Sequence, residues 1–173
     1  MVRFDNKIGY VKYADMEFVA DSVHYDNQQT NQKFYVYNDE YLYNGPGLFF
    51  QDSQFMIPKG SIINSSIYYY ISGVRWLYVD YEGHKGWILE SCRDSKNYLY
   101  RNIVYGSANL VEEKKGSINI GDNNTSLFRY AFSSDKIADL PKNLDLSYDY
   151  ITANSGVIYY HVVYNGMDGF IKS

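Results

Sequence analysis

The chain has 173 residues but only one cysteine, Cys92, which excludes a disulfide framework and any cysteine-rich metal site. Cys92 follows a predicted strand and has beside it neither a nucleophile elbow nor a helix start that would activate a thiol. The three histidines, His24, His84 and His161, lie in different contexts and form no metal-binding motif. We therefore expect no catalytic residue, no metal site and no cofactor, and we do not expect an enzyme.

Long apolar runs and basic clusters are also missing from the chain. No segment approaches the roughly 20 consecutive apolar residues of a membrane-spanning helix, so membrane insertion is not expected. The net charge is −4 and no basic run is longer than Lys114-Lys115, which argues against nucleic acid as a partner.

The first residues do not resemble a signal peptide, because residues 1–5 already read as part of a hairpin. We therefore expect the chain to start inside a repeated unit. Either a longer protein has been trimmed, in which case we expect an upstream domain as a neighbour, or a remnant pair of strands begins the chain.

Aromatic residues are abundant, with 21 Tyr, nine Phe and two Trp. Aromatic side chains suit the half-buried surface of a pleated sheet, so this composition predicts an all-β fold. So many tyrosines exceed what two small cores can bury. We therefore expect several rings at the surface, where an aromatic ring with a polar tip favours binding.

Three segments repeat one hairpin pattern, in which a Val and an aromatic residue precede a tight turn, and a Gly, an aromatic and a β-branched residue follow it. The turn contains Asn6 in the first copy, Gly83 in the second and Asn165-Gly166 in the third. Gly and Asn adopt the positive φ of a tight hairpin turn more easily than other residues. The three segments are residues 2–11, 79–88 and 162–171.

The second and third copies belong to a longer duplication, since residues 49–88 align without a gap on residues 132–171. Gly60 aligns with Asn143 in a turn that follows a Pro-Lys pair, and this exchange predicts a positive φ at both positions. We expect two similar units. The pairs predicted to superpose are Val79 with Val162 and Gly86 with Gly169.

Short β segments with frequent turns predict small barrels or sandwiches rather than βαβ units. Residues 97–111 are ambiguous and fit either a strand or a short helix. The predicted organisation is a closing hairpin of a partial repeat at residues 1–13, a connecting segment or long loop at 14–40, a barrel at 41–92, a connecting segment at 93–126 and a second barrel at 127–173.

Residues 41–90 contain an ordered set of turn and hairpin residues, namely Asn44-Gly45-Pro46, Ile57-Pro58-Lys59-Gly60, Gly73, Trp76, Val79, Tyr81, Gly83, Gly86, Trp87 and Ile88. This set resembles the bacterial Src-homology-3-like (SH3b-type) domain family. Residues 127–173 match less closely, because Asn143 replaces the turn Gly, and Tyr159 and Phe170 replace the two Trp. Residues 1–13 match only the closing hairpin of the family.

The resemblance implies an all-β chain of tandem small SH3-like barrels with polar connecting segments. Domains of this family are typically non-catalytic binding modules of secreted, cell-surface or cell-envelope proteins. The expected partner is therefore a cell-wall peptide or glycan of peptidoglycan, or a protein of the cell surface.

Strand periodicity selects the candidate binding residues. In residues 76–81, Leu77, Val79 and Tyr81 share the face that we expect in the core, and Trp76 lies on the other face. An alternative is that Trp76 only caps the end of the barrel. Trp87 and Phe170 are expected to be structural. The side chains expected to face a ligand are Trp76, Tyr78, Tyr41 and Tyr43 in the first unit, and Tyr159 and His161 in the second.

Two functions remain open at this point. In the first, the chain is an extracytoplasmic binding or targeting module that holds cell-wall peptidoglycan or its peptides in aromatic grooves. In the second, it is a protein-interaction or spacer region of a larger secreted protein and has no small ligand. Exposure of the candidate rings in a cleft favours the first, whereas mutual burial between the barrels favours the second.

Overall fold

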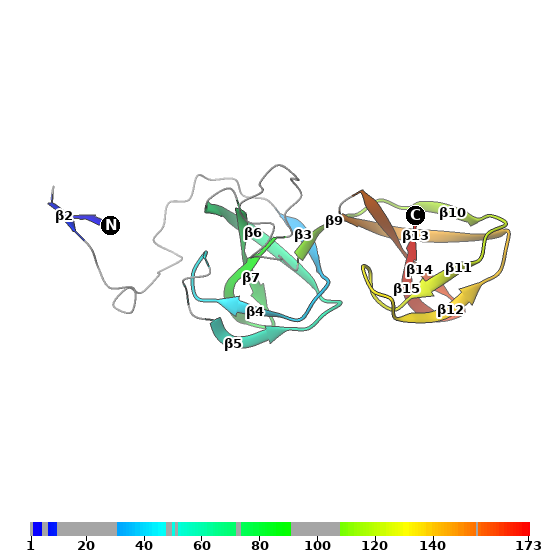
Figure 1. The fold of residues 1–173 in the computed structure, drawn as a ribbon, viewed down its shortest axis with the longest axis horizontal. Helices are drawn as coiled ribbons and strands as arrows, with labels where there is room; N and C mark the ends of the chain where they lie inside the picture. The colour runs from blue at the N-terminus through cyan, green and yellow to red at the C-terminus, as the bar shows by residue number, and fades with distance from the viewer. Residues whose placement is uncertain are drawn as a thin grey trace.

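The computed structural model is all-β over the residues that it describes, as predicted (Figure 1). That part contains fifteen strands and no helix, and so no helix that could cross a membrane. The structure describes residues 2–4, 7–9, 31–47, 50, 52–71, 74–90, 108–154 and 156–173. The strands are β1 (Val2–Phe4), β2 (Lys7–Gly9), β3 (Gln32–Val36), β4 (Glu40–Tyr43), β5 (Asp52–Ile57), β6 (Ile62–Ile71), β7 (Val74–Tyr81), β8 (His84–Leu89), β9 (Ala108–Glu112), β10 (Gly116–Ile120), β11 (Thr125–Phe128), β12 (Lys136–Leu140), β13 (Leu144–Asn154), β14 (Val157–Tyr164) and β15 (Met167–Lys172).

Thirteen of these strands form one sheet, and β1 and β2 form a separate two-stranded sheet. The large sheet contains two units of six antiparallel strands with the same order, which is β3-β6-β7-β8-β4-β5 in the first unit and β10-β13-β14-β15-β11-β12 in the second. Strand β9 lies between the units, where it pairs with β3 on one side and with β13 on the other (Figure 1). One shared strand thus joins the two units.

The repeated hairpin pattern corresponds to a repeated strand register. In all three hairpins the Val of the pattern is paired with the Gly of the pattern. The second and third hairpins thus have the same register, as two similar units should. No helix interrupts the described residues between Ser61 and Ile88. The pairs are Val2 with Gly9, Val79 with Gly86, and Val162 with Gly169.

The exchange of Gly for Asn at the turn before the long strand also has the predicted geometry. Gly60 has a φ of 91° and Asn143 a φ of 56°. The amide of Gly60 donates a hydrogen bond of 2.7 Å to the carbonyl of Val36, and the amide of Asn143 donates one of 2.7 Å to the carbonyl of Ile120. Only residues that tolerate the left-handed region fit this turn without strain.

Each unit has its own apolar core, built from the alternating positions of its strands. Leu77 and Val79 are buried in the first core, as the periodicity predicted. The cores contain Phe34, Val36, Leu42, Ile57, Ile63, Leu77, Val79, Ile88 and Ala108 in the first unit, and Ile120, Leu127, Leu140, Leu146, Val162 and Ile171 in the second.

The unit boundaries expected from the sequence were too narrow. Residues 14–40 were expected to connect the units, but they include β3, and residues 93–126 include β9, β10 and the start of β11. Strand β10 leaves most of its side chains exposed, which is why its polar composition suggested a loop. Residues 108–111 of the ambiguous segment are strand, whereas Cys92 and His24 lie outside the described residues.

The hairpin near the N-terminus is present as β1 and β2. Among the described residues no third strand pairs with it. Because an isolated two-stranded hairpin is marginally stable in water, we expect another part of the chain or another molecule to complete this sheet, and this stays a prediction.

Replacing Gly169 with Ala is expected to lower the free energy of unfolding by about 1–3 kcal/mol, because the added methyl group overpacks the contact between β15 and β11. A Cβ at this position would lie 2.7 Å from the carbonyl oxygen of Phe128 and 2.9 Å from Leu127 Cγ. Urea denaturation measures the effect. Gly121→Ala is the control, because a Cβ at Gly121 meets nothing within 4 Å. Equal urea midpoints for the two variants would contradict the overpacking.

Candidate functional site

Trp76 lies on the face of β7 opposite the first core, as the alternation predicted, but its side chain is buried. Only 3% of Trp76 is exposed, and it packs with Trp87 and Leu89. The ring of Tyr43 meets it edge to face, with the ring centroids 5.4 Å apart. The exposure expected for Trp76 is therefore not observed, because the long strands of the first unit bury aromatic side chains on both of their faces, and its contact with a ligand stays a prediction.

Tyr159, the counterpart of Trp76 in the second unit, is also buried, with 7% of its surface exposed. It belongs to a cluster at the contact between the two units, which we call the junction cluster, and Phe132 lies against it with the ring centroids 4.6 Å apart. Burial raises the pKa of Tyr159. The exposure expected for Tyr159 is therefore also not observed, and its ligand-facing role stays a prediction. The junction cluster consists of Tyr35, Val111, Ala131, Tyr159 and Phe170.

Of the other predicted aromatics of the first unit, Tyr43 and Tyr78 pack against the cluster of Trp76 and Trp87, whereas Tyr41 does not. Tyr41 is 46% exposed and pairs across the strands with Met56. Tyr43 is half-buried against Trp76, and Tyr78 packs on Trp87 at 5.2 Å between ring centroids. The buried positions of Trp87 and Phe170 agree with the structural role expected for both.

His161 is the predicted residue around which the structure gathers polar groups. A β-bulge in β13 places Asp149 and Tyr150 together opposite His161 on β14. The imidazole Nδ1 lies 2.6 Å from Asp149 Oδ1, and Nε2 lies 2.9 Å from Asp168 Oδ1 on β15. The ring of Tyr150 stacks on the imidazole at 4.4 Å between centroids. Three strands and two carboxylates therefore fix the orientation of one histidine ring.

Two adjacent hollows extend from this histidine to the first unit, and we call them together the junction groove. Each has a volume of about 660 Å³, and both are lined by Lys115 and Asp149. One reaches the first unit, whereas the other runs along the second unit. The groove is lined by Lys33, Ile62, Val111, Glu113, Lys115, Gly116, Ser147, Tyr148, Asp149, Tyr150, His161, Val162 and Val163.

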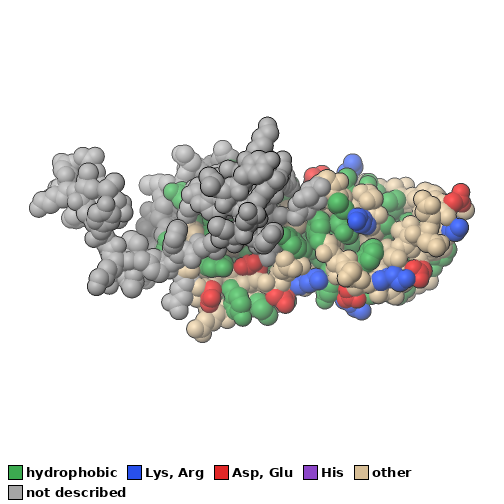
Figure 2. Space-filling model, in the orientation of Figure 1, with side chains coloured by type: hydrophobic (Ala, Val, Ile, Leu, Met, Phe, Trp, Pro, Cys, Tyr) green, Lys and Arg blue, Asp and Glu red, His purple; other side chains and the backbone are tan. Residues whose placement is uncertain are grey.

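The groove presents charges of both signs beside apolar surface. Lys33 and Glu113 form an ion pair across the junction. Burial raises the pKa of Tyr150, so its phenol remains neutral at physiological pH and can donate a hydrogen bond. Acidic and basic side chains are also interspersed on the described surface of the second unit in Figure 2, without a field of one sign. The arrangement suits a ligand that carries polar and apolar groups.

Most residues of the groove were not predicted from the sequence. Lys115 lies in a segment that read as a polar connection, and Asp149 lies on a strand whose bulge has no recognisable sequence signal. The only indication was that His161 replaces Tyr78 at the equivalent position of the duplication, on a face that also carries the neighbouring aromatic residues.

The described residues contain no group of three His, Cys, Asp or Glu side chains arranged to hold a metal ion. His161 has two carboxylates at its ring nitrogens, and within the described parts of the chain its hydrogen-bond partners include no Ser, Cys or Thr nucleophile. The arrangement is therefore suited to hold and orient polar groups.

Comparison with known proteins gave one structural match. No protein-family model and no curated protein matches the chain. Among solved structures, the chain is similar to a candidate autolysin from Listeria monocytogenes, with 12% sequence identity and a TM-score of 0.31. The match covers 84% of this chain and 62% of that chain, so the chain spans about three fifths of that protein's length. At so low an identity and TM-score, the likeness identifies neither a family nor an activity.

Proposed function

We propose that the chain is a non-catalytic, extracytoplasmic binding module of two joined SH3-like barrels, which holds cell-wall peptidoglycan or its peptides in the junction groove. The junction groove is the observation that carries this proposal. It offers charges of both signs and exposed apolar side chains along one continuous surface. An extended peptide has the same combination of groups.

The two units support the SH3-like part of the proposal. They share one order of six antiparallel strands, and their closing hairpins have the same register. The residues of the resemblance also occupy matching places, since the turn at Gly60 recurs at Asn143 with the same hydrogen bond.

In this proposal the aromatic residues act as a scaffold, and the ligand lies beside them. Tyr35 of the first unit and Phe170 of the second meet edge to face, with the ring centroids 5.1 Å apart. Contacts of this kind hold the two walls of the groove at a fixed distance. A preformed groove loses less conformational entropy when a ligand binds.

A second candidate function is supported by the same junction. Burial of Tyr159 and Tyr35 between the units, together with the shared strand β9, makes the two units one continuous sheet. A protein-interaction or spacer region of a larger secreted protein needs this property and no small ligand.

Co-sedimentation with purified peptidoglycan sacculi separates the two candidates. We expect the protein to sediment with sacculi and Lys115→Glu to bind about tenfold more weakly, because a charge-assisted contact contributes about 1.5–3 kcal/mol. Lys142→Glu is the matched control, since Lys142 is exposed and lies outside the groove. If the folded wild-type protein stays in the supernatant, the binding function is contradicted and the spacer function is favoured.

A further inference from the structure

We propose that the junction groove selects a short peptide that carries a free amino group and a free carboxylate, with the carboxylate at Lys115 and the amino group at Asp149. This inference rests on the proposed function and names the chemistry of its ligand. It comes from the juxtaposition of one basic and one acidic side chain, unpaired with each other, on the same groove.

Lys115 is the cationic end of this site. Within the described residues it takes part in no hydrogen bond or ion pair, whereas Lys33, the other lysine of the groove, is neutralised by Glu113. Lys115 is exposed and lines both hollows. An ammonium group in this state has all three of its N–H donors available for a ligand carboxylate.

Asp149 is the acidic end, and it lines both hollows together with Lys115. Gly116 and Tyr148 form the last pair of the β10–β13 ladder, so Lys115 and Asp149 each lie one residue beyond that pair. Asp149 and Asp168 share one imidazole. Even with His161 protonated, these three groups carry one net negative charge, which favours a ligand ammonium group.

Apolar side chains flank the charged pair on both sides. Val163 is 58% exposed at one end of the groove, and Ile62 is 38% exposed at the other end, near Val111. A short peptide bound at the charged pair can cover one of these side chains with a methyl group. An uncharged sugar chain would leave both charges without a partner, so the groove favours peptide over glycan.

Titration with three forms of one peptide tests this inference. The probes are trialanine with free ends, its C-terminal amide and its N-acetyl derivative, each followed by calorimetry or by amide chemical shifts in NMR. We expect the free peptide to bind at least about tenfold more tightly than either blocked form. Lys115→Gln should abolish the difference between the free peptide and the amide, and Asp149→Asn the difference between the free peptide and the acetyl form.

Two matched controls keep these outcomes specific. Lys142→Gln removes an exposed lysine outside the groove, and Asp145→Asn makes the same change as Asp149→Asn four residues earlier on β13. Both should bind the three peptides as the wild type does. The titration of the wild-type protein with the three peptides tests the inference even if a variant does not fold.

The inference would be overturned by equal affinity for the three peptides, by the absence of binding, or by preference for an N-acetylglucosamine trimer. Sedimentation with sacculi then shows whether the ligand chemistry alone is wrong or the proposed function as well. If sacculi retain the protein while the peptides give no selectivity, the ligand chemistry is wrong and the proposed function stands. If the sacculi do not retain it either, both are wrong.

Discussion

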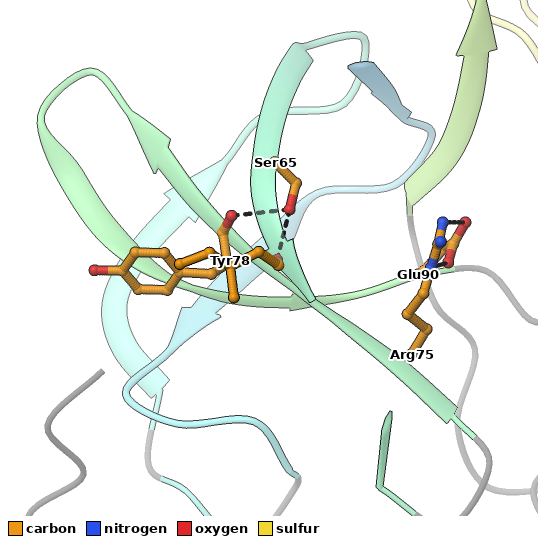
Figure 3. A network of polar contacts seen from close by, with 5 residues as sticks. Ser65, Arg75, Tyr78 and Glu90 are labelled. Atoms are coloured by element: carbon orange, nitrogen blue, oxygen red, sulfur yellow. Dashed lines mark hydrogen bonds and ion pairs between the residues drawn. The ribbon is translucent and has the colours of Figure 1, made fainter. Parts of the chain in front are cut away.

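Replacing Arg75 with Met is expected to lower the free energy of unfolding by about 3–5 kcal/mol, because it leaves a buried carboxylate without its partner. The guanidinium group donates through Nε and Nη2 to the two carboxylate oxygens of Glu90 (Figure 3). The side chains of this pair are only 17% and 6% exposed. The guanidinium also lies over the ring of Tyr68 at 4.9 Å from its centroid.

The double variant Arg75→Met/Glu90→Leu is the control for this prediction, and urea denaturation is the measurement. The double variant removes both charges, so most of the stability that Arg75→Met loses should return. The pair ties the first residues of β7 to the end of β8, where the amide of Glu90 also donates to the carbonyl of Arg75 at 3.0 Å. A single variant within about 1 kcal/mol of the wild type would show that water screens the pair.

Replacing Tyr35 with Ala is expected to lower the free energy of unfolding by about 3–5 kcal/mol, because it opens a cavity in the junction cluster. Tyr35 belongs to β3 of the first unit, yet its ring packs on Phe170 of the second. Its hydroxyl oxygen accepts a hydrogen bond of 3.2 Å from the amide of Ala131. Burial raises the pKa of Tyr35, consistent with a phenol that stays neutral inside the junction.

Two further variants separate the contributions of Tyr35. Tyr35→Phe keeps the ring but leaves the buried amide of Ala131 without its acceptor, for an expected loss of about 1–3 kcal/mol. Tyr41→Ala removes an exposed ring outside the junction and should change the stability by about 0.5 kcal/mol or less. If Tyr35→Ala unfolds at the same urea concentration as the wild type, the two units do not stabilise each other through this cluster.

The hairpin turns and the core faces of the strands were predictable because their signals are local. A positive φ at Gly60 and at Asn143 follows from the residue types that the turn accepts, whatever the rest of the chain does. The burial of Leu77 and Val79 follows from the period of two in an extended strand. Both properties are visible within ten residues of sequence.

The exposure of the candidate binding residues was only partly predictable, because it depends on what covers a strand. The alternation correctly separated Trp76 from Val79, but it could not show that further aromatic side chains pack over Trp76. The same limit applied to Tyr159, which the first unit helps to cover.

The sequence by itself determined the all-β class, the hairpin turns, the register within the hairpins and the core face of the repeated strands, since each depends on the conformation of neighbouring residues. The tertiary structure alone decided that β9 joins the two units and that a bulge sets Asp149 beside His161. It also decided that Lys115 and Asp149 share one groove. These features depend on pairing between segments far apart in the chain, for which composition and periodicity carry no signal.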